Sequence, residues 1–272
     1  MYRHVYDSFK YLYDKGGVIY IISDPHFSDE EMYKLRGVPL IRVGKSLYKV
    51  THFPDDKDKE LKAEPTTFEA LDMEQVKKIN SRVGKNDVII FLGDIGNIEP
   101  VKKIRGYKIL IMGNHEQGAS NYKRVVELKQ FNYDDSDNET TFKLEEEAIK
   151  QGFKLEGYTQ FADHLEKRYS LDNHLFDEVY EGPLMINDRV ILSHEPIMGL
   201  PDYMFNIHGH THSNKIEDDH HLNVCMEVVG GVPVNFTRII KDGLLKNISS
   251  IHQTTIEKAT AKKQKRLAQN KK

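Results

Sequence analysis

The chain has 272 residues, of which 39% are hydrophobic and 30% charged, and its formal net charge is −3. This composition is typical of a folded globular protein and excludes a largely disordered one. The longest apolar runs are five residues, too short to span a membrane, and the first 17 residues lack the apolar stretch of a signal peptide. A single cysteine, Cys225, excludes an internal disulfide and a thiolate zinc cage. We therefore expect a reduced, cytoplasmic protein without a membrane partner.

Charge is distributed unevenly along the chain. Residues 249–272 carry seven Lys or Arg and one Glu, a net of +6, which leaves −9 on residues 1–248. We expect one domain over 1–248 and a basic C-terminal tail over 249–272, the tail being a solvated helix or a contact for an acidic partner, RNA or DNA. The acidic domain itself disfavours non-specific binding of nucleic acid.

Strand-like and helix-like patterns alternate along the chain, which predicts a layered α/β fold. Short aliphatic runs predict buried strands at residues 17–23, 86–92, 107–112, 189–193, 204–208 and 222–229. Helical patterns cover residues 72–83, 99–106, 120–130 and 140–152. We expect Asp72 to be the N-cap of the first, and Pro100 and Gly106 to mark the first turn and the end of the second.

Two long stretches interrupt this alternation. Residues 28–71 contain a hairpin pattern at 39–50 and then a charged run, and residues 131–188 contain an acidic loop and further helix-like pieces. Long excursions from a compact domain are often binding loops or lids, although surface decoration explains them equally well. Because residues 28–71 follow a strand directly, we predict that this insertion lies near the active site.

Five of the six predicted strands are followed at once by side chains that bind metals or carry protons. These are Asp24 and His26, Asp94, Asn114 and His115, His194, and His210 and His212. Each alone could be an ordinary turn or hydrogen-bonded residue. In layered α/β folds, however, reacting groups gather at the carboxyl ends of the strands, so five such ends would bring these side chains to one crevice.

The chemistry of this set indicates a binuclear metal site. Seven candidate ligands are more than the roughly four to six positions of one ion, so two ions sharing a ligand explain them best. Oxygen and imidazole ligands suit Mn²⁺ first, with Fe, Zn²⁺ or Ni²⁺ as alternatives. Two divalent ions bring about +4 and Asp24 and Asp94 return −2, which leaves a centre that attracts a phosphoryl group.

The ordered motifs Asp-x-His, Gly-Asp, Gly-Asn-His-Glu, a single His and Gly-His-x-His, from 24 to 212, resemble the signature of the calcineurin-like metallophosphoesterases. The resemblance implies a four-layer αββα sandwich with two metal ions. It also implies a role for each residue: Asp24, His26 and His212 hold one ion, Asn114, His194 and His210 hold the other, Asp94 bridges them, and His115 faces the substrate phosphate. The segments at 176–196 and 222–235 look like a small prokaryotic or phage branch.

Other features modify this interpretation. The first two motifs are 70 residues apart, against a few tens in shorter members, and "GDIGNIEP" lacks the Asp-Arg-Gly extension of the Ser/Thr protein phosphatases. His208 is expected in the core or behind the ligands, and Gly209 is expected to let the backbone approach the ions. His220 and His221 are expected to be exposed loop residues.

The sequence therefore predicts a metal-dependent phosphoesterase that hydrolyses a small phosphodiester or cyclic nucleotide through a metal-bridging hydroxide. A nuclease is an alternative that the basic tail favours and the acidic domain opposes. A third alternative is a metal-stabilised interaction module without turnover, which the full ligand set and His115 disfavour. The sequence makes no prediction of the oligomeric state.

Overall fold

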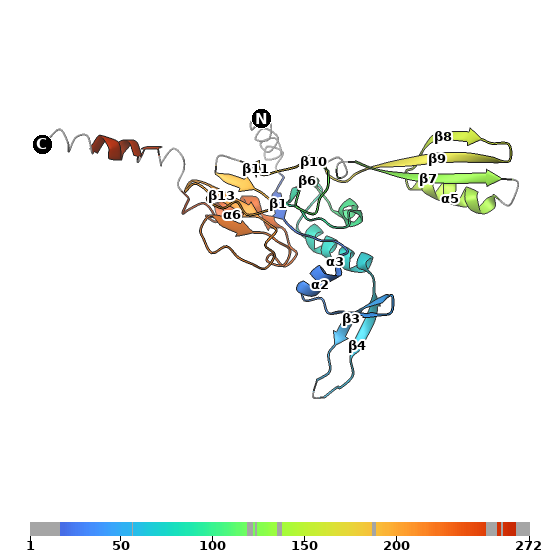
Figure 1. The fold of residues 1–272 in the computed structure, drawn as a ribbon, viewed down its shortest axis with the longest axis horizontal. Helices are drawn as coiled ribbons and strands as arrows, with labels where there is room; N and C mark the ends of the chain where they lie inside the picture. The colour runs from blue at the N-terminus through green and yellow to red at the C-terminus, as the bar shows by residue number, and fades with distance from the viewer. Residues whose placement is uncertain are drawn as a thin grey trace. The chain divides into compact units, whose positions relative to one another are not determined.

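The computed structural model describes residues 17–55, 57–118, 122, 124–134, 138–186, 189–248, 255–256 and 258–264 (Figure 1). The chain is mixed α/β and divides into two compact units, the first formed by residues 1–119 and 177–272 and the second by residues 120–176. Among the described residues, none of the helices combines the length and the apolar character that crossing a bilayer requires.

Two sheets form the framework of the first unit. The five-stranded sheet has the order β10 (Glu178–Tyr180), β6 (Tyr107–Ile111), β5 (Val88–Phe91), β1 (Ile19–Ile22) and β15 (Val234–Asn235). The four-stranded sheet has the order β11 (Leu184–Met185), β12 (Val190–Leu192), β13 (Phe205–His208) and β14 (His221–Asn223). All neighbours in both sheets are parallel except β15 on β1 and β11 on β12. Parallel strands bring their carboxyl ends to one edge.

The core of the first unit lies between these sheets. Alternate residues of both sheets, such as Ile21, Ile90, Leu192 and Ile207, belong to one buried cluster, and Phe236 of helix α6 (Phe236–Lys241) joins it. Strands β1, β5 and β13 are buried at every position, so their other side chains are covered as well. This accounts for the uninterrupted apolar runs from which β1 and β5 were predicted.

The last predicted strand is shorter than its apolar pattern. Strand β14 ends at Asn223, and the amides of Val228 and Val229 both donate to the carbonyl of Cys225, which folds the following residues into a turn. Cys225 itself forms only an isolated parallel bridge with Ser23, just beyond β1. The chain therefore turns back beside the end of β1 rather than extending the sheet.

The insertion forms a small subdomain beside α3. Its described elements are α2 (Glu30–Leu35), β2 (Leu40–Val43), β3 (Ser46–His52) and β4 (Lys62–Thr66), followed by α3 (Phe68–Asn80). The predicted hairpin is confirmed as β2 and β3, and β4 adds a third antiparallel strand. Tyr33, Leu40, Leu47 and Leu71 form a separate core that ties these elements together.

Helix α3 begins earlier than the sequence predicted. Its N-cap is Thr67, whose hydroxyl accepts from the amide of Ala70 at 3.1 Å, so the prediction of Asp72 as N-cap is wrong. Asp72 lies inside the helix and is buried. Its carboxylate accepts a hydrogen bond from Ser28 in a distant loop rather than from the amides at the start of the helix. The predicted helix at 99–106 is a shorter 3₁₀ helix, η1 (Glu99–Lys103), with Pro100 in its first turn.

The second unit packs one helix on a three-stranded antiparallel sheet. Its elements are β7 (Arg124–Asp134), α5 (Glu139–Lys150), β8 (Lys154–Gln160) and β9 (His164–His174), with sheet order β7-β9-β8. The core contains Phe131, Ala148, Phe153 and Tyr169. Helix α5 confirms the prediction at 140–152.

The prediction of a helix at 120–130 is wrong, because β7 pairs with β9 along its whole length. Local helical preference is a weak force against such long-range pairing. The predicted tail, 249–272, lies largely outside the described residues; residues 255–256 and 258–264 of it are helical and exposed.

Candidate metal centre

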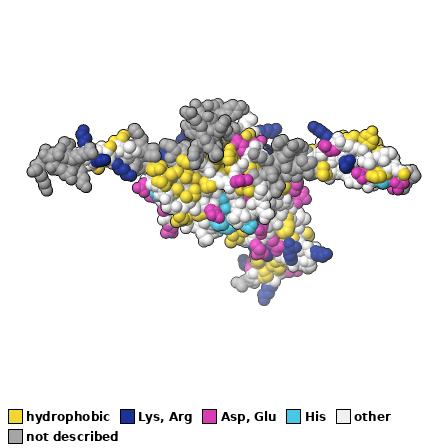
Figure 2. All heavy atoms as spheres, turned by 45° about the horizontal axis from the view of Figure 1, so that its top comes forward, with side chains coloured by type: hydrophobic (Ala, Val, Ile, Leu, Met, Phe, Trp, Pro, Cys, Tyr) yellow, Lys and Arg dark blue, Asp and Glu magenta, His cyan; other side chains and the backbone are white. Residues whose placement is uncertain are grey.

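The seven predicted ligands come together in the first unit, each just beyond a strand of one of its two sheets. Asp24 and His26 follow β1, Asp94 follows β5, Asn114 follows β6, His194 follows β12, and His210 and His212 follow β13. Figure 2 shows histidine side chains gathered on one face of this unit. Their ligand atoms fall into two neighbouring groups.

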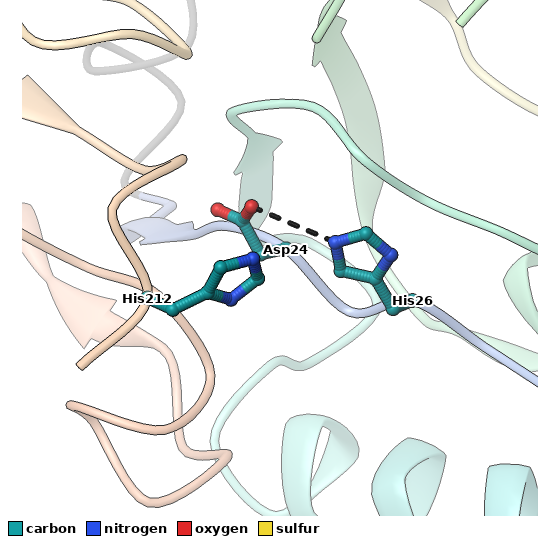
Figure 3. A group of neighbouring side chains, drawn as sticks. All are labelled: Asp24, His26 and His212. Carbon is teal, nitrogen blue, oxygen red and sulfur yellow. Dashed lines mark ion pairs between the residues drawn. The ribbon is translucent and has the colours of Figure 1, made fainter. Parts of the chain in front are cut away.

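The first group contains Asp24, His26 and His212, which point toward one another from the ends of β1 and β13 (Figure 3). One ligand atom of each lies within 4.8 Å of the others. Asp24 Oδ1 and His26 Nε2, which lie 3.8 Å apart, are both buried without a hydrogen-bond partner. A buried polar atom without a partner costs about 1–3 kcal/mol, so two side by side fit a cation that would satisfy them together.

The second group contains Asp94, His194 and His210, with Asn114 beside them. The Asn114 Oδ1 atom lies 2.8 Å from His194 Nε2 and 3.0 Å from His210 Nδ1, and the two nitrogens are 3.1 Å apart. Ligands placed octahedrally at about 2.1 Å from an ion are roughly 3.0 Å from each other. These three atoms are therefore spaced as the ligands of one ion would be.

A backbone contact fixes which nitrogen of His194 faces the group. His194 Nδ1 lies 2.7 Å from the carbonyl oxygen of Leu92, which can only accept a hydrogen bond. The proton of the neutral ring is therefore on Nδ1, and the lone pair of Nε2 points at Asn114 and His210. A second ring nitrogen held by a carbonyl is the usual arrangement for a histidine that binds a metal.

Asp94 lies between the two groups. Its Oδ2 atom is 3.5 Å from His26 Nε2 in the first group and 3.4 Å from His194 Nε2 in the second. One carboxylate oxygen is thus close to both ligand sets, which is the position that a bridging ligand needs. The side chain is almost fully buried, at 3% exposure, so the surrounding structure holds it there.

The electrostatics of the first group favour a cation. Burial acts to raise the pKa of Asp24, but the nearby His26 ring, Ser23, His194 and the amide of His210 lower it well below its usual value. Burial acts to lower the pKa of His26, but Asp24 and Asp94 outweigh it and raise this pKa. The two carboxylates thus create a negative potential at the His26 ring, which favours positive charge at that place.

The backbone at the ligands is strained. Among the described residues, the non-glycine residues with positive φ are Asp24 (54°), His26 (42°), Ser28 (63°), Asp94 (53°), His210 (66°) and His212 (48°). Such a conformation costs on the order of 1–3 kcal/mol per residue and persists where the surroundings enforce it, commonly at functional sites. Five of these six residues are predicted ligands, so the strain is concentrated where the side chains converge.

Two glycines allow the close approach of the ligand loops. A Cβ atom at Gly209 would lie 1.9 Å from Ser23 Oγ and 2.3 Å from Asp24 Oδ2. A Cβ atom at Gly113 would lie 2.3 Å from Asp94 Oδ1. Any side chain at either position would displace a ligand. This agrees with the expectation that Gly209 brings the backbone close to the site.

The remaining histidines differ in their surroundings. His115 is 65% exposed, and its Nε2 lies 3.9 Å from Asp94 Oδ2, at the open side of the centre. His208 is fully buried, its Nδ1 is 2.8 Å from the carbonyl of Gly209, and burial lowers its pKa. The prediction that His221 is an exposed loop residue is wrong: it begins β14, its side chain is 4% exposed, and its Nδ1 bonds to Asp218. His220 is half-buried.

Sequence reasoning gave no role to Glu116, which organises the centre from behind. Its buried carboxylate accepts from the amides of Asp94 at 2.9 Å, Ile95 at 2.8 Å and Gly113 at 2.6 Å. It therefore joins the loop after β5 to the loop after β6. The residue was visible in the Gly-Asn-His-Glu motif, but the bonds that it makes depend on the fold.

Comparison with known proteins adds little. No family model matches the chain, and no curated protein matches it. A solved structure of a protein of unknown function from Aquifex aeolicus is similar at 18% identity, with 83% of this chain and 98% of that chain covered and a TM-score of 0.42. At this degree of similarity it carries no argument about fold family or activity. The site geometry has to carry the functional argument.

Proposed function

We propose that this chain is a binuclear, metal-dependent phosphoesterase of the calcineurin-like type, with the four-layer αββα arrangement of that family. The observation that carries the proposal is that one buried carboxylate, Asp94, lies within 3.5 Å of a histidine in each of two ligand groups. The orphaned atoms of the first group and the spacing in the second both fit divalent cations.

Two divalent ions bound here would supply a hydroxide nucleophile at neutral pH and neutralise charge on a phosphoryl group. Asp24 and Asp94 are the charged side chains among the seven ligands, so the loaded centre keeps a positive charge that attracts a phosphate ester. His115 stands exposed at the edge of the centre, where its ring can contact the substrate without binding an ion. Its amide donates to Asp94 Oδ1 at 3.1 Å, which fixes its backbone.

The space beside the centre favours a small substrate. A cavity of about 330 Å³ is lined by Asn114 and His194 together with Glu181, Pro183 and Ile197. Volumes of about 300–1,000 Å³ are typical of small-molecule sites. The acidic Glu181 and the negative charge of residues 1–248 both oppose a nucleic acid strand. A small phosphodiester or a cyclic nucleotide fits these constraints best.

The test is hydrolysis of bis-p-nitrophenyl phosphate by protein stripped with EDTA and reloaded with Mn²⁺. We expect turnover only after reloading, and a loss of at least about 10²-fold in Asp94→Asn, which removes the shared charge. Asp218→Asn is the matched control, because Asp218 pairs with His221 outside both ligand groups. No turnover with Mn²⁺, Fe²⁺, Zn²⁺ or Ni²⁺ would contradict the proposal, and a preference for single-stranded DNA or RNA would favour a nuclease.

A further inference from the structure

Arg36, at the end of α2, reaches from the insertion to the backbone of the metal centre. Its Nη2 donates to the carbonyl of Asp24 at 2.6 Å and its Nη1 to the carbonyl of Pro25 at 2.7 Å. Its Nε donates to Glu227 Oε1 at 3.0 Å. The side chain is only 10% exposed. One planar guanidinium thus holds the peptide groups that follow the ligand Asp24 and a carboxylate from the far end of the chain.

Glu227 in turn lies beside the ligand His212. Its Oε1 is 3.5 Å from His212 Nδ1, slightly longer than a hydrogen bond, and its side chain is 5% exposed. His212 Nδ1 and Glu227 Oε2 are both buried without a hydrogen-bond partner. A small rotation of either side chain would let Nδ1–H donate to the carboxylate and would satisfy both residues.

A further cation between His212, Cys225 and Glu227 is the competing explanation, because their ligand atoms also lie within 4.8 Å of one another. Two contacts argue against it. The positive guanidinium of Arg36 already occupies Glu227 Oε1, and the Cys225 thiol donates to Asp24 Oδ2 at 3.2 Å. A carboxylate paired with an arginine beside a histidine ring is suited to orienting that ring instead.

We infer that Arg36 and Glu227 are positioning residues for the ion held by Asp24, His26 and His212. Glu227 accepts the Nδ1–H of His212, which leaves Nε2 to face the ion. Arg36 fixes the Glu227 carboxylate and the backbone between Asp24 and His26. The insertion therefore serves as part of the scaffold of the metal centre. This inference rests on the proposed binuclear centre, but not on phosphoesterase activity.

The first test measures Mn²⁺ binding by titration calorimetry. In Glu227→Gln we expect one of the two ions to bind about 10–100-fold more weakly, with the other unchanged, since that is the usual effect of removing such a partner. Arg36→Lys should weaken the same ion, because one ammonium cannot donate to three acceptors in the geometry of the guanidinium fork. Glu30→Gln and Arg42→Lys are matched controls, because these two residues form an ion pair in the same insertion and Arg42 is exposed. Both variants should bind Mn²⁺ as the wild type does.

The second test needs no variant. In the ¹⁵N spectrum of the wild-type protein loaded with Zn²⁺, His212 should carry its proton on Nδ1 and bind through Nε2. Any of three results would overturn the inference. They are coordination of His212 through Nδ1, unchanged Mn²⁺ affinity in Glu227→Gln and Arg36→Lys, and equal weakening of both ions. Wild-type protein that binds no metal would overturn it together with the proposed function. Two bound ions and the expected His212 tautomer without hydrolysis would overturn the proposed function alone.

Discussion

Ser28 and Asp72 lie 44 residues apart and are joined by two hydrogen bonds of 2.7 Å, from the amide and the hydroxyl of Ser28 to the two carboxylate oxygens of Asp72. The hydroxyl of Tyr33 donates to the same carboxylate, and burial together with this bond raises the pKa of Tyr33. Ser28 follows the ligand His26 by two residues and has a φ of 63°. A buried side chain of α3 therefore holds the strained loop that carries a predicted ligand.

We predict that Asp72→Ala destabilises the protein by about 2–4 kcal/mol, because it removes the carboxylate that accepts from the half-buried Ser28 amide and from the hydroxyl of the buried Tyr33. Urea unfolding of the metal-free protein measures this. Lys77→Ala, at an exposed position of the same helix, is the control and should change stability by less than about 0.5 kcal/mol. Equal losses in both variants would show that the Asp72 bonds add nothing.

A methyl group at position 209 should damage metal binding. In Gly209→Ala the new Cβ would have to displace Ser23 Oγ and Asp24 Oδ2, so we expect Mn²⁺ affinity to fall by at least about 10-fold. Equilibrium dialysis with Mn²⁺ is the measurement. Gly157→Ala is the matched control, because a Cβ there meets nothing within 4 Å. Unchanged binding by Gly209→Ala would mean that the loop can move away without cost.

The second unit should show an acid-dependent stability of its own. Burial acts to raise the pKa of Glu145, but Tyr133, Tyr169 and Lys167, which all donate to its carboxylate, lower it. A carboxyl whose folded pKa lies below its unfolded value of about 4.5 stabilises the fold above that value. This stability is lost as the pH falls from about 4.5 through the folded pKa.

Hydrogen exchange of peptides from 124–174 at pH 7 and about pH 4 measures this loss. We expect Glu145→Gln to exchange faster than the wild type at pH 7, with a smaller difference at the lower pH, since the stability that the carboxylate contributes declines once the pH falls below its unfolded pKa of about 4.5. Glu146→Gln, at an exposed position on the same helix, should match the wild type at both pH values. A constant difference between Glu145→Gln and the wild type would mean that packing rather than charge matters here.

The strands and the convergence of the predicted ligands could be predicted because their signals are local. An apolar run such as 88–92 and the Asp94 that follows it lie within one short window of sequence, and parallel strands bring such ends together. The contacts that orient the ligands were not predictable in this way. Arg36 and Glu227 are 191 residues apart, and neither stands in a recognisable motif.

The wrong predictions have the same cause. Residues 120–130 have helical character locally, but pairing with β9 decides their conformation. Asp72 looks like an N-cap because it precedes a helical pattern. In the structure its carboxylate accepts hydrogen bonds from Ser28 and Tyr33, which belong to the insertion. His221 looks like a loop residue within "EDDHH", and a parallel pairing with Asn206 places it in a strand. Long-range contacts overrode the local pattern in each case.

His115 provides the sharpest test of the catalytic proposal. Charge develops on the transferred oxygens and on the leaving alkoxide in phosphoryl transfer, and an exposed histidine ring beside Asp94 can donate a hydrogen bond to the first or a proton to the second. We predict that His115→Ala lowers kcat by about 10²–10⁴-fold, roughly 3–5 kcal/mol of barrier, while two ions stay bound. The measurement is kcat and metal content on the same preparation.

The leaving group separates the two roles of His115. If leaving-group protonation dominates, the loss in His115→Ala should be much smaller for a p-nitrophenyl ester than for an alkyl ester, because p-nitrophenolate needs little protonation. An equal loss for both esters would assign His115 to the transferred oxygens. His164→Ala, in the second unit, is the control and should keep wild-type kcat. Normal kcat in His115→Ala would exclude a catalytic role. Loss of an ion would make His115 a ligand, because its ring would then contribute to metal binding rather than to turnover.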